Sequence, residues 1–164
     1  MRRYALTVAD SLLTPWLAAH AQGASPASAY HRDYGYVPLS DGVRIAYVAY
    51  RPTRDGKYPT IMQYDPYVAA GSGPNPTWLD KGYAYIGVSV RGTGCSQGTF
   101  SFLNGESHGA DGAEIVNWIA RQPWSDGAVG LWGSSYPAHT AYFVAAKRPA
   151  ALKAMVTSSI TANV

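Results

Sequence analysis

Cysteine is almost absent from this sequence of 164 residues, which contains only Cys95. No disulfide can therefore form within the chain, and a zinc site built from several thiolates is excluded. Cys95 lies in a glycine-rich segment with no base expected beside it, so we interpret it as an inert free thiol. The cysteine count consequently says nothing about the cellular compartment.

Charge is also scarce, because Asp, Glu, Lys and Arg make up only 14% of the residues and the net charge is +3. No cluster of Lys or Arg forms a stripe, which argues against a nucleic-acid partner. His108 with Asp111 is a lone pair of possible metal ligands, so we expect no metal site and no cofactor. The 47% hydrophobic content and 13 tyrosines instead indicate a globular domain with a strand-containing core.

The N-terminus has the order of a secretory signal peptide. Residues 1–3 are basic, residues 4–17 are mostly apolar, and Ala19-His20-Ala21 offers an A-x-A cleavage site. An aspartate and a proline interrupt the apolar stretch, and the alternative interpretation is an uncleaved amphipathic helix. We predict a signal peptide over residues 1–21 and a secreted or periplasmic protein that leaves the membrane after cleavage.

A short linker is expected to precede the folded domain. Residues 22–33 are mainly small and polar, and we assign them to this linker, with one domain over residues 34–164. Residues 34–39 and 43–50 have the composition of strands, and the Asp-Gly pair at 41–42 is typical of the turn between two antiparallel strands. The domain is therefore predicted to begin with a hairpin.

Strands and helices then alternate along the chain. The patterns predict strands at residues 60–64, 84–90, 128–132 and 153–158, and helices at residues 77–81, 108–121 and 138–147. Such alternation implies a mostly parallel sheet with crossover helices. The predicted fold class is α/β, with an antiparallel hairpin at the N-terminal side of the sheet.

The segment Gly133-Ser134-Ser135 lies between a predicted strand and a predicted helix. This is the arrangement of a nucleophile elbow, in which small flanking residues allow the sharp turn that exposes the serine. The backbone N–H of Tyr136 could then donate to the oxyanion of a tetrahedral intermediate. Pro137 replaces the second glycine of the G-x-S-x-G motif, which the first turn of a helix tolerates.

Two other interpretations of this turn stay open at this point. Ser135 could be an ordinary helix cap after a Gly-Ser turn, with no catalytic role. Ser134 is a rival nucleophile, although it occupies the variable position of the motif. We favour Ser135 as the nucleophile.

Three ordered segments resemble the X-Pro dipeptidyl-peptidase and acyl-esterase family of α/β-hydrolases. They are Q-P-W-S-D-G-A-V-G-L-W-G-S-S-Y at residues 122–136, V-R-G-T-G-C-S-Q-G at residues 90–98, and D-P-Y at residues 65–67. The resemblance runs from about Tyr34 to the end of the chain. It implies the N-terminal part of an α/β-hydrolase fold, truncated before the helical cap and the C-terminal β-sandwich of the family.

The resemblance also implies a function and its residues. Ser135 corresponds to the nucleophile, the Tyr136 N–H to the first oxyanion donor and the Tyr67 hydroxyl to the second. The implied activity is that of a serine hydrolase, which cleaves a small-molecule ester, an amide or a short peptide through an acyl-enzyme. One departure is Ser89, where the family commonly has an aspartate, so Arg91 is expected to lack an ion pair.

The acid and the base of a catalytic triad are not found after the serine. In α/β-hydrolases the order is Ser, then Asp or Glu, then His. Residues 136–164 contain no Asp, no Glu and one histidine, His139. We therefore expect a fragment, with a separately encoded C-terminal half as a conceivable partner. The alternative is a catalytically incomplete remnant or a non-enzymatic binding module.

The remaining titratable residues are given structural interpretations. His139 is expected to point along its own helix, away from the side where a base must approach. His108 is interpreted as a surface or cap-region residue that precedes a helix. Asp111 and Glu114 are expected in the first turn of that helix, where carboxylates meet the positive end of the helix dipole.

Overall fold

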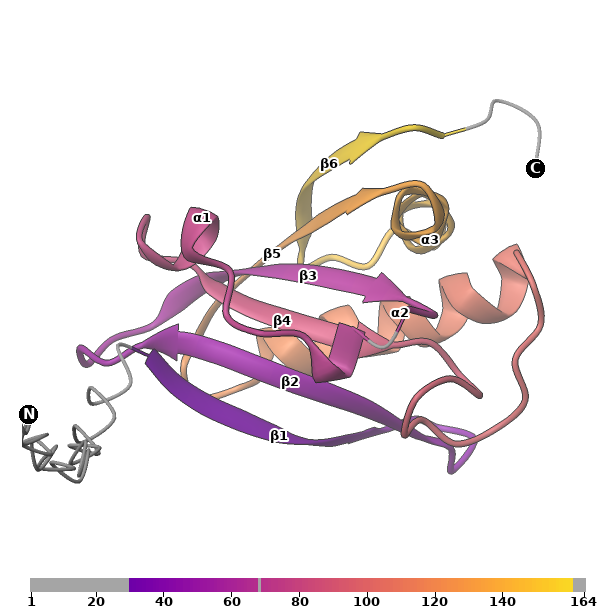
Figure 1. Cartoon of the computed structure of the whole chain (residues 1–164), viewed down its shortest axis with the longest axis horizontal. Helices are drawn as coiled ribbons and strands as arrows, with labels where there is room; N and C mark the ends of the chain where they lie inside the picture. Colours follow the sequence, from indigo (N-terminus) through magenta and orange to yellow (C-terminus); the bar gives the residue numbers. More distant parts are fainter. Residues whose placement is uncertain (1–29, 68, 161–164) are drawn as a thin grey trace, which may run out of the picture.

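Residues 30–67 and 69–160 are described by a computed structural model (Figure 1). The predicted signal peptide and residues 22–29 of the predicted linker lie outside these residues. The strands are β1 (Tyr30–Pro38), β2 (Arg44–Pro52), β3 (Tyr58–Asp65), β4 (Ala84–Ser89), β5 (Ser125–Ser134) and β6 (Leu152–Ser158). The helices are η1 (Ala69–Gly71), α1 (Pro76–Leu79), α2 (Gly105–Ala120) and α3 (Tyr136–Ala146).

The six strands form one sheet in the order β1-β2-β4-β3-β5-β6. β1, β2 and β4 are paired antiparallel, whereas β4, β3, β5 and β6 are paired parallel. This arrangement confirms the predicted parallel sheet with an N-terminal hairpin. The carboxyl ends of the parallel strands meet at one edge, where substrate sites of open α/β sheets are built.

The hairpin turn has the predicted chemistry but β1 is longer than expected. Gly42 has a φ of 85°, and the Asp41 carboxylate accepts the N–H of Val43 at 3.0 Å. β1 begins at Tyr30, which pairs with Pro52, so residues 30–33 of the predicted linker belong to the strand. An ion pair between Asp33 and Arg51 at 3.0 Å lies within this extension. The polar composition that indicated a linker is explained by the position of β1 at the edge of the sheet.

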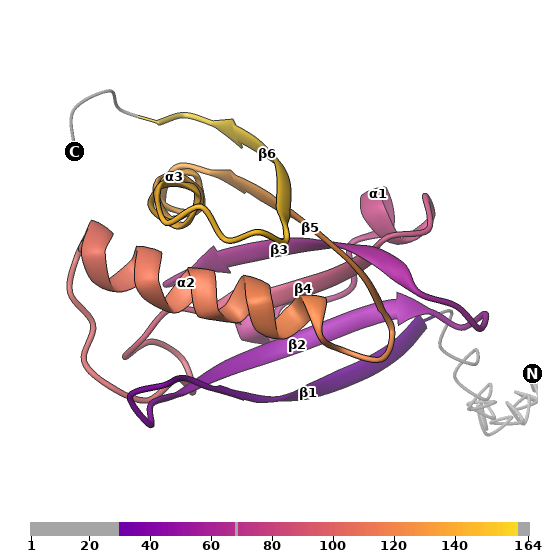
Figure 2. The ribbon, with the colours of Figure 1, turned by 180° about the vertical axis from the view of Figure 1, so that it is seen from behind.

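The main core lies between one face of the sheet and helices α2 and α3, which Figure 2 shows together on that face. A Cβ on Gly112 would lie 2.1 Å from a methyl carbon of Val144, so only glycine allows the two helices to approach this closely. The buried side chains of this core include Met62, Ile86, Val88, Ile115, Val116, Ile119, Leu131 and Val144. This buried layer holds α3 against β3 and β5, and α2 against β5 and α3.

The opposite face of the sheet is covered less completely. A smaller cluster centred on Val48, Leu79 and Tyr85 packs beneath α1. β6 is the outer strand and is paired only with β5 among the described residues. Val156 on β6 is 58% exposed. This face therefore exposes apolar side chains, and the outer edge of β6 is unpaired within the described residues.

Candidate active site

The predicted sharp turn is present between β5 and α3. Ser135 has φ 63° and ψ −125°, a conformation that non-glycine residues rarely adopt and that costs on the order of 1–3 kcal/mol. The side chain of Ser135 is exposed and makes no capping hydrogen bond to α3. Ser135 thus occupies the N-cap position of α3, but its side chain does not cap the helix. Ser134, by contrast, is the last residue of β5 and pairs with Ser158.

The residues around Ser135 explain how the chain closes this turn. A Cβ on Gly133 would lie 2.3 Å from Cβ of Pro137, so the first position of the motif must be glycine. Pro137 lies in the first turn of α3, where its missing N–H costs no helical hydrogen bond. The N–H of Ser135 donates to the carbonyl of Ser158 at 3.1 Å, which ties the turn to the end of β6.

Tyr136 is the first residue of α3, so its N–H belongs to the group of helix-start donors without intrahelical acceptors. Its side chain is buried, and burial raises the pKa of its phenol. The phenol oxygen accepts the N–H of Leu103 at 2.8 Å and lies 2.9 Å from Nε2 of His108. The rings of Phe100 and Phe102 lie against Tyr136.

His108 is not the surface or cap-region residue that the sequence indicated. α2 begins at Gly105 with Asn104 as its cap, so His108 lies within the helix and is 1% exposed. Its ring faces the core because α2 packs on the sheet through this side. Burial lowers the pKa of His108, while Asp111 raises it and Arg91 lowers it further.

Tyr67 lies next to Tyr136 although 69 positions separate them in the sequence, from 67 to 136. Their ring centroids are 6.1 Å apart in an edge-to-face arrangement. The side chain of Tyr67 is 65% exposed. The structure thus brings an accessible phenol to the ring of the residue that follows Ser135.

Asp65 holds the backbone of Tyr67, a role that sequence reasoning missed. The buried Asp65 carboxylate accepts the N–H of Tyr67 at 2.7 Å and Nε2 of Gln63 at 2.7 Å. Burial raises the pKa of Asp65, and the bonds from Gln63, Tyr67 and Ala69 offset part of that effect. The Asp-Pro-Tyr sequence could have indicated this, since Asp side chains commonly bond the N–H two residues later.

Arg91 is paired, contrary to expectation. Its guanidinium makes a two-pronged contact with Asp111, at 2.8 Å and 2.7 Å, and a further contact of 2.7 Å with Asp41. These carboxylates raise the pKa of Arg91. Ser89, the position of the departure, instead accepts the N–H of Ala70 at 3.2 Å. The ion pair was missed because its partners come from α2 and from the hairpin turn.

The two acidic residues of α2 are also placed differently from the prediction. The helix begins at Gly105, so Asp111 and Glu114 lie beyond its first turn. Asp111 neutralises Arg91, and Glu114 accepts the N–H of Ser40 at 2.8 Å and its hydroxyl at 2.7 Å. Contacts with distant parts of the chain, rather than the helix dipole, account for both carboxylates.

His139 lies one turn after Ser135 on the same helix. Its Nδ1 lies 3.0 Å from the backbone carbonyl of Ser135, and because a carbonyl only accepts, Nδ1 donates. The side chain is largely buried. This ring nitrogen is therefore directed at the backbone of Ser135.

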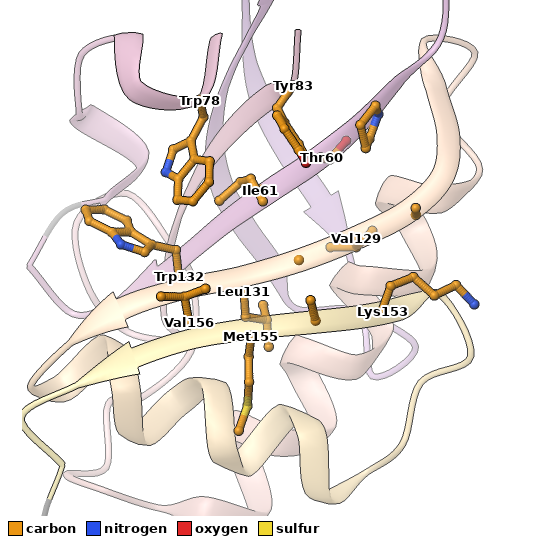
Figure 3. A pocket seen from close by; sticks show the side chains of 14 residues that line it. Thr60, Ile61, Trp78, Tyr83, Val129, Leu131, Trp132, Lys153, Met155 and Val156 are labelled. Carbon is orange, nitrogen blue, oxygen red and sulfur yellow. The ribbon is translucent and has the colours of Figure 1, made fainter. Parts of the chain in front are cut away.

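An apolar groove of about 320 Å³ lies elsewhere, on the face of the sheet that carries α1 (Figure 3). Trp78 and Trp132 form one wall with their rings 6.5 Å apart. Buried polar atoms of two lining residues, Oγ1 of Thr60 and Nε1 of Trp78, make no hydrogen bond in the described part of the chain. The groove includes neither Ser135 nor Tyr67, so it is separate from the serine turn.

Among residues 30–67 and 69–160, no helix has the length and apolar character needed to cross a membrane. The same part of the chain contains no group of three or more His, Cys, Asp or Glu arranged to hold a metal ion.

Comparison with known proteins gives concordant results. Residues 41–164 match the X-Pro dipeptidyl-peptidase (S15) family. The cocaine esterase of Rhodococcus sp. (strain MB1 Bresler) is 36% identical over 134 residues, which are 77% of this chain and 23% of that protein. A putative serine esterase of Mycobacterium bovis is 34% identical over 139 residues, covering 66% of this chain and 22% of its own length. The chain thus spans less than a quarter of the length of these two relatives.

Solved structures show the same fold. A CocE/NonD family hydrolase from Staphylococcus aureus superimposes with a TM-score of 0.71 at 30% identity, covering 77% of this chain and 27% of that one. An alpha-amino acid ester hydrolase superimposes with a TM-score of 0.72 at 24% identity, covering 88% of this chain and 28% of that one. The predicted α/β-hydrolase fold class and the predicted family resemblance are both confirmed.

Proposed function

Since the chain belongs to the X-Pro dipeptidyl-peptidase (S15) family, we propose that it carries the nucleophile and the oxyanion hole of a serine hydrolase. The observation that supports this most strongly is the backbone of Ser135, at φ 63° and ψ −125° at the start of an uncapped helix. A fold keeps such strain only where the surrounding structure imposes it, and strained residues cluster at active sites. The exposed hydroxyl is then the group that meets the substrate.

The proposed reaction is acyl transfer. The Ser135 hydroxyl gives its proton to a base while its oxygen forms a bond to the carbonyl carbon of an ester or amide, and the resulting oxyanion accepts the N–H of Tyr136 and the hydroxyl of Tyr67. Collapse breaks the bond to the alcohol or amine, which leaves with the electron pair and takes up that proton, and water later releases the acid. The Tyr67 phenol is suited to this role because its O–H is a hydrogen-bond donor.

We further propose that the base and the acid come from polypeptide outside the 164 residues. Residues 136–164 offer no carboxylate, and Nδ1 of His139 is engaged with the backbone carbonyl of Ser135. The open edge of β6, the exposed Val156 and the unsatisfied polar atoms of the groove suit a further strand and helix. The two relatives, more than four times as long as the matched part, are consistent with such an addition.

The proposed substrates are small esters, amides or short peptides. The relatives include a cocaine esterase, and the family is described by an X-Pro dipeptidyl-peptidase activity. Two exposed rings, Tyr67 and Phe102, each lie edge-to-face with the Tyr136 ring and offer an apolar surface to the acyl group of a substrate. Residues 1–21 support export of the protein, which the N-terminal sequence of the mature chain would test.

The function is tested with p-nitrophenyl acetate, whose leaving group needs no general acid. We expect the chain to release one equivalent of p-nitrophenolate and to retain one acetyl group, since deacylation without a base is slow. Peptide mapping should place the acetyl group on Ser135, and Ser135→Ala should abolish it. The matched control, Ser134→Ala, should leave it unchanged. Acetylation spread over lysines, equal in wild type and Ser135→Ala, would contradict the proposal and favour a non-enzymatic module.

The contribution of the second oxyanion donor is measured in the same assay. Tyr67→Phe removes only the hydroxyl, so the ring contact with Tyr136 is retained. Loss of one oxyanion donor is expected to slow acylation by about 10²–10³-fold. The control is Tyr142→Phe, at another exposed tyrosine, on α3, which should change nothing. Equal rates for wild type and Tyr67→Phe would remove Tyr67 from the oxyanion hole.

A further inference from the structure

The peptide unit between Ser135 and Tyr136 is held at its oxygen end by three donors. Its carbonyl oxygen accepts the N–H of Ala138 at 2.9 Å, the N–H of His139 at 3.2 Å and Nδ1 of His139 at 3.0 Å. The N–H of Tyr136 belongs to the same planar unit, so these bonds restrict the direction of that N–H as well. Donation to a carbonyl also polarises its peptide group, which strengthens the opposite N–H as a donor.

The phenol oxygen of Tyr136 is held by Leu103 and His108. These two contacts determine which ring nitrogen of His108 carries the proton. The N–H of Leu103 can only donate, so the phenol oxygen accepts it. If the phenol donates its own proton to Nε2 of His108, one buried group remains unsatisfied, Nδ1–H of His108. The opposite assignment leaves two, the phenol proton and the Nδ1 lone pair. Each unsatisfied buried group costs free energy, so the first assignment, which leaves fewer of them, is favoured.

The surroundings of His108 keep the ring neutral and in place. Phe100 stacks on it with ring centroids 6.0 Å apart, and Phe143 and Tyr64 lie at 6.5 Å. The neighbouring charges are Asp111 on its own helix and Arg91 on the loop after β4, which oppose one another. A neutral imidazole with Nε2 free of a proton is therefore the form that accepts the phenol.

We propose that His108 and His139 are positioning residues that clamp the Ser135–Tyr136 peptide unit and so aim the N–H of Tyr136 at the substrate oxyanion. This inference rests on the proposed function for its consequence, but the clamp itself is a property of the fold. The phenol bonds to His108 and Leu103 hold the side chain of Tyr136, and through it Cα of Tyr136, which is one end of the peptide unit. His139 restrains the same unit through its carbonyl.

The clamp is tested first without any activity, by long-range ¹H–¹⁵N NMR correlation of the histidine rings in the folded chain. We expect His108 to be the tautomer with its proton on Nδ1 and its Nε2 unprotonated, and His139 to carry a proton on Nδ1. His108→Gln serves as an assignment control, since it removes one set of ring signals while its side-chain carbonyl can still accept the phenol. A proton on Nε2 of neutral His108 would overturn the proposal.

The consequence is then tested by the rate of acetylation of Ser135 by p-nitrophenyl acetate. His108→Phe keeps an aromatic ring but offers no acceptor, and we expect acylation to slow by about 10-fold, since small misplacements of catalytic groups cost up to about 10²-fold. His108→Gln should restore the rate to within about twofold of wild type, because its carbonyl oxygen replaces Nε2 as acceptor. A purely structural role would lower the melting temperature of both variants without this difference in rate.

The NMR and rate measurements distinguish failure of the clamp from failure of the proposed function. If wild type is not acetylated at Ser135 but the NMR signals show the expected tautomers, the proposed function fails and the clamp stands. If wild type is acetylated and a folded His108→Phe reacts at the wild-type rate, the clamp has no catalytic role. If His108→Phe does not fold, the role of His108 is tested by the tautomers in wild type and by the acylation rate of His108→Gln. An acylation rate of His108→Gln at least about 10-fold below wild type would contradict the role of His108 as acceptor of the phenol.

Discussion

Gly133 and Pro137 approach each other across the turn that carries Ser135, so closely that a Cβ on Gly133 would lie 2.3 Å from Cβ of Pro137 and 2.6 Å from its carbonyl carbon. The contact joins the last residues of β5 to the first turn of α3. Ser135 lies between them in its left-handed conformation. The turn is thus set by packing as well as by the local sequence.

Gly133→Ala should consequently destabilise the fold. The clash is with a proline ring and a helix backbone, which cannot move aside, so we expect a loss of about 1–3 kcal/mol in the free energy of unfolding. Urea unfolding followed by tryptophan fluorescence measures it. Gly73→Ala is the matched control, because a Cβ there meets no atom within 4 Å. Equal stability of the two variants would show that the turn is not packed as described.

The strain at Ser135 makes a separate prediction. Ser135→Gly should be more stable than Ser135→Ala by about 1 kcal/mol, since glycine adopts a φ of 63° without strain and the gain exceeds its larger unfolded-state entropy. Both variants lack the hydroxyl, so the comparison isolates the backbone. The difference is measured by chemical unfolding of both proteins. An alanine variant that equals or exceeds the glycine variant in stability would argue against a strained turn.

Removing the acidic partner of Arg91 should be costly. Asp111 is buried and Arg91 keeps only the exposed Asp41 when the carboxylate is lost, so Asp111→Asn is expected to lower the unfolding free energy by about 3 kcal/mol. The control is Asp33→Asn, which breaks the more accessible, half-buried pair with Arg51 and should cost less than about 1 kcal/mol. A larger loss of unfolding free energy for Asp33→Asn than for Asp111→Asn would contradict this ranking of the two ion pairs.

His108 should contribute to the pH dependence of stability. Burial lowers its pKa in the folded chain below the ordinary value of 6.5, so the unfolded chain binds more protons below that pH. The contribution is complete above about pH 6.5 and is lost as the pH falls, by at most about 1.4 kcal/mol per pH unit. His108→Gln should flatten this part of the curve. Parallel curves for wild type and His108→Gln between pH 6.5 and the folded-state pKa would contradict it.

The features that the sequence predicted are those that neighbouring residues determine. The turn after β1 follows from Asp41-Gly42, and the turn after β5 follows from a short apolar strand, a G-x-S segment and an Ala-rich helix. Both patterns have a local physical cause, namely the conformational freedom of glycine and the switch from strand to helix periodicity. The order of the strands in the sheet was not predicted, because it does not follow from the pattern of any single segment.

The features that the sequence did not predict depend on contacts between distant elements. Arg91 finds Asp111 and Asp41 only after α2 and the hairpin turn pack beside the loop that follows β4. His108 is buried because α2 begins earlier than its apolar spacing indicated and turns this residue toward Tyr136. Residue spacing cannot reveal such pairs, because their partners are 20, 50 and 28 positions away, from 91 to 111, 91 to 41 and 108 to 136.

Activation of Ser135 by the fold is measured by the rate at which a fluorophosphonate probe labels the serine. The rate of labelling, read by intact mass and peptide mapping, is compared between the native chain, the chain in urea and Ser135→Ala. We predict one adduct, on Ser135, that forms about 10³-fold faster in the native chain than in urea, the advantage expected from an oxyanion hole without a base. Equal labelling rates in the native and urea-unfolded chain, or a native adduct that persists in Ser135→Ala, would show that the fold does not activate Ser135.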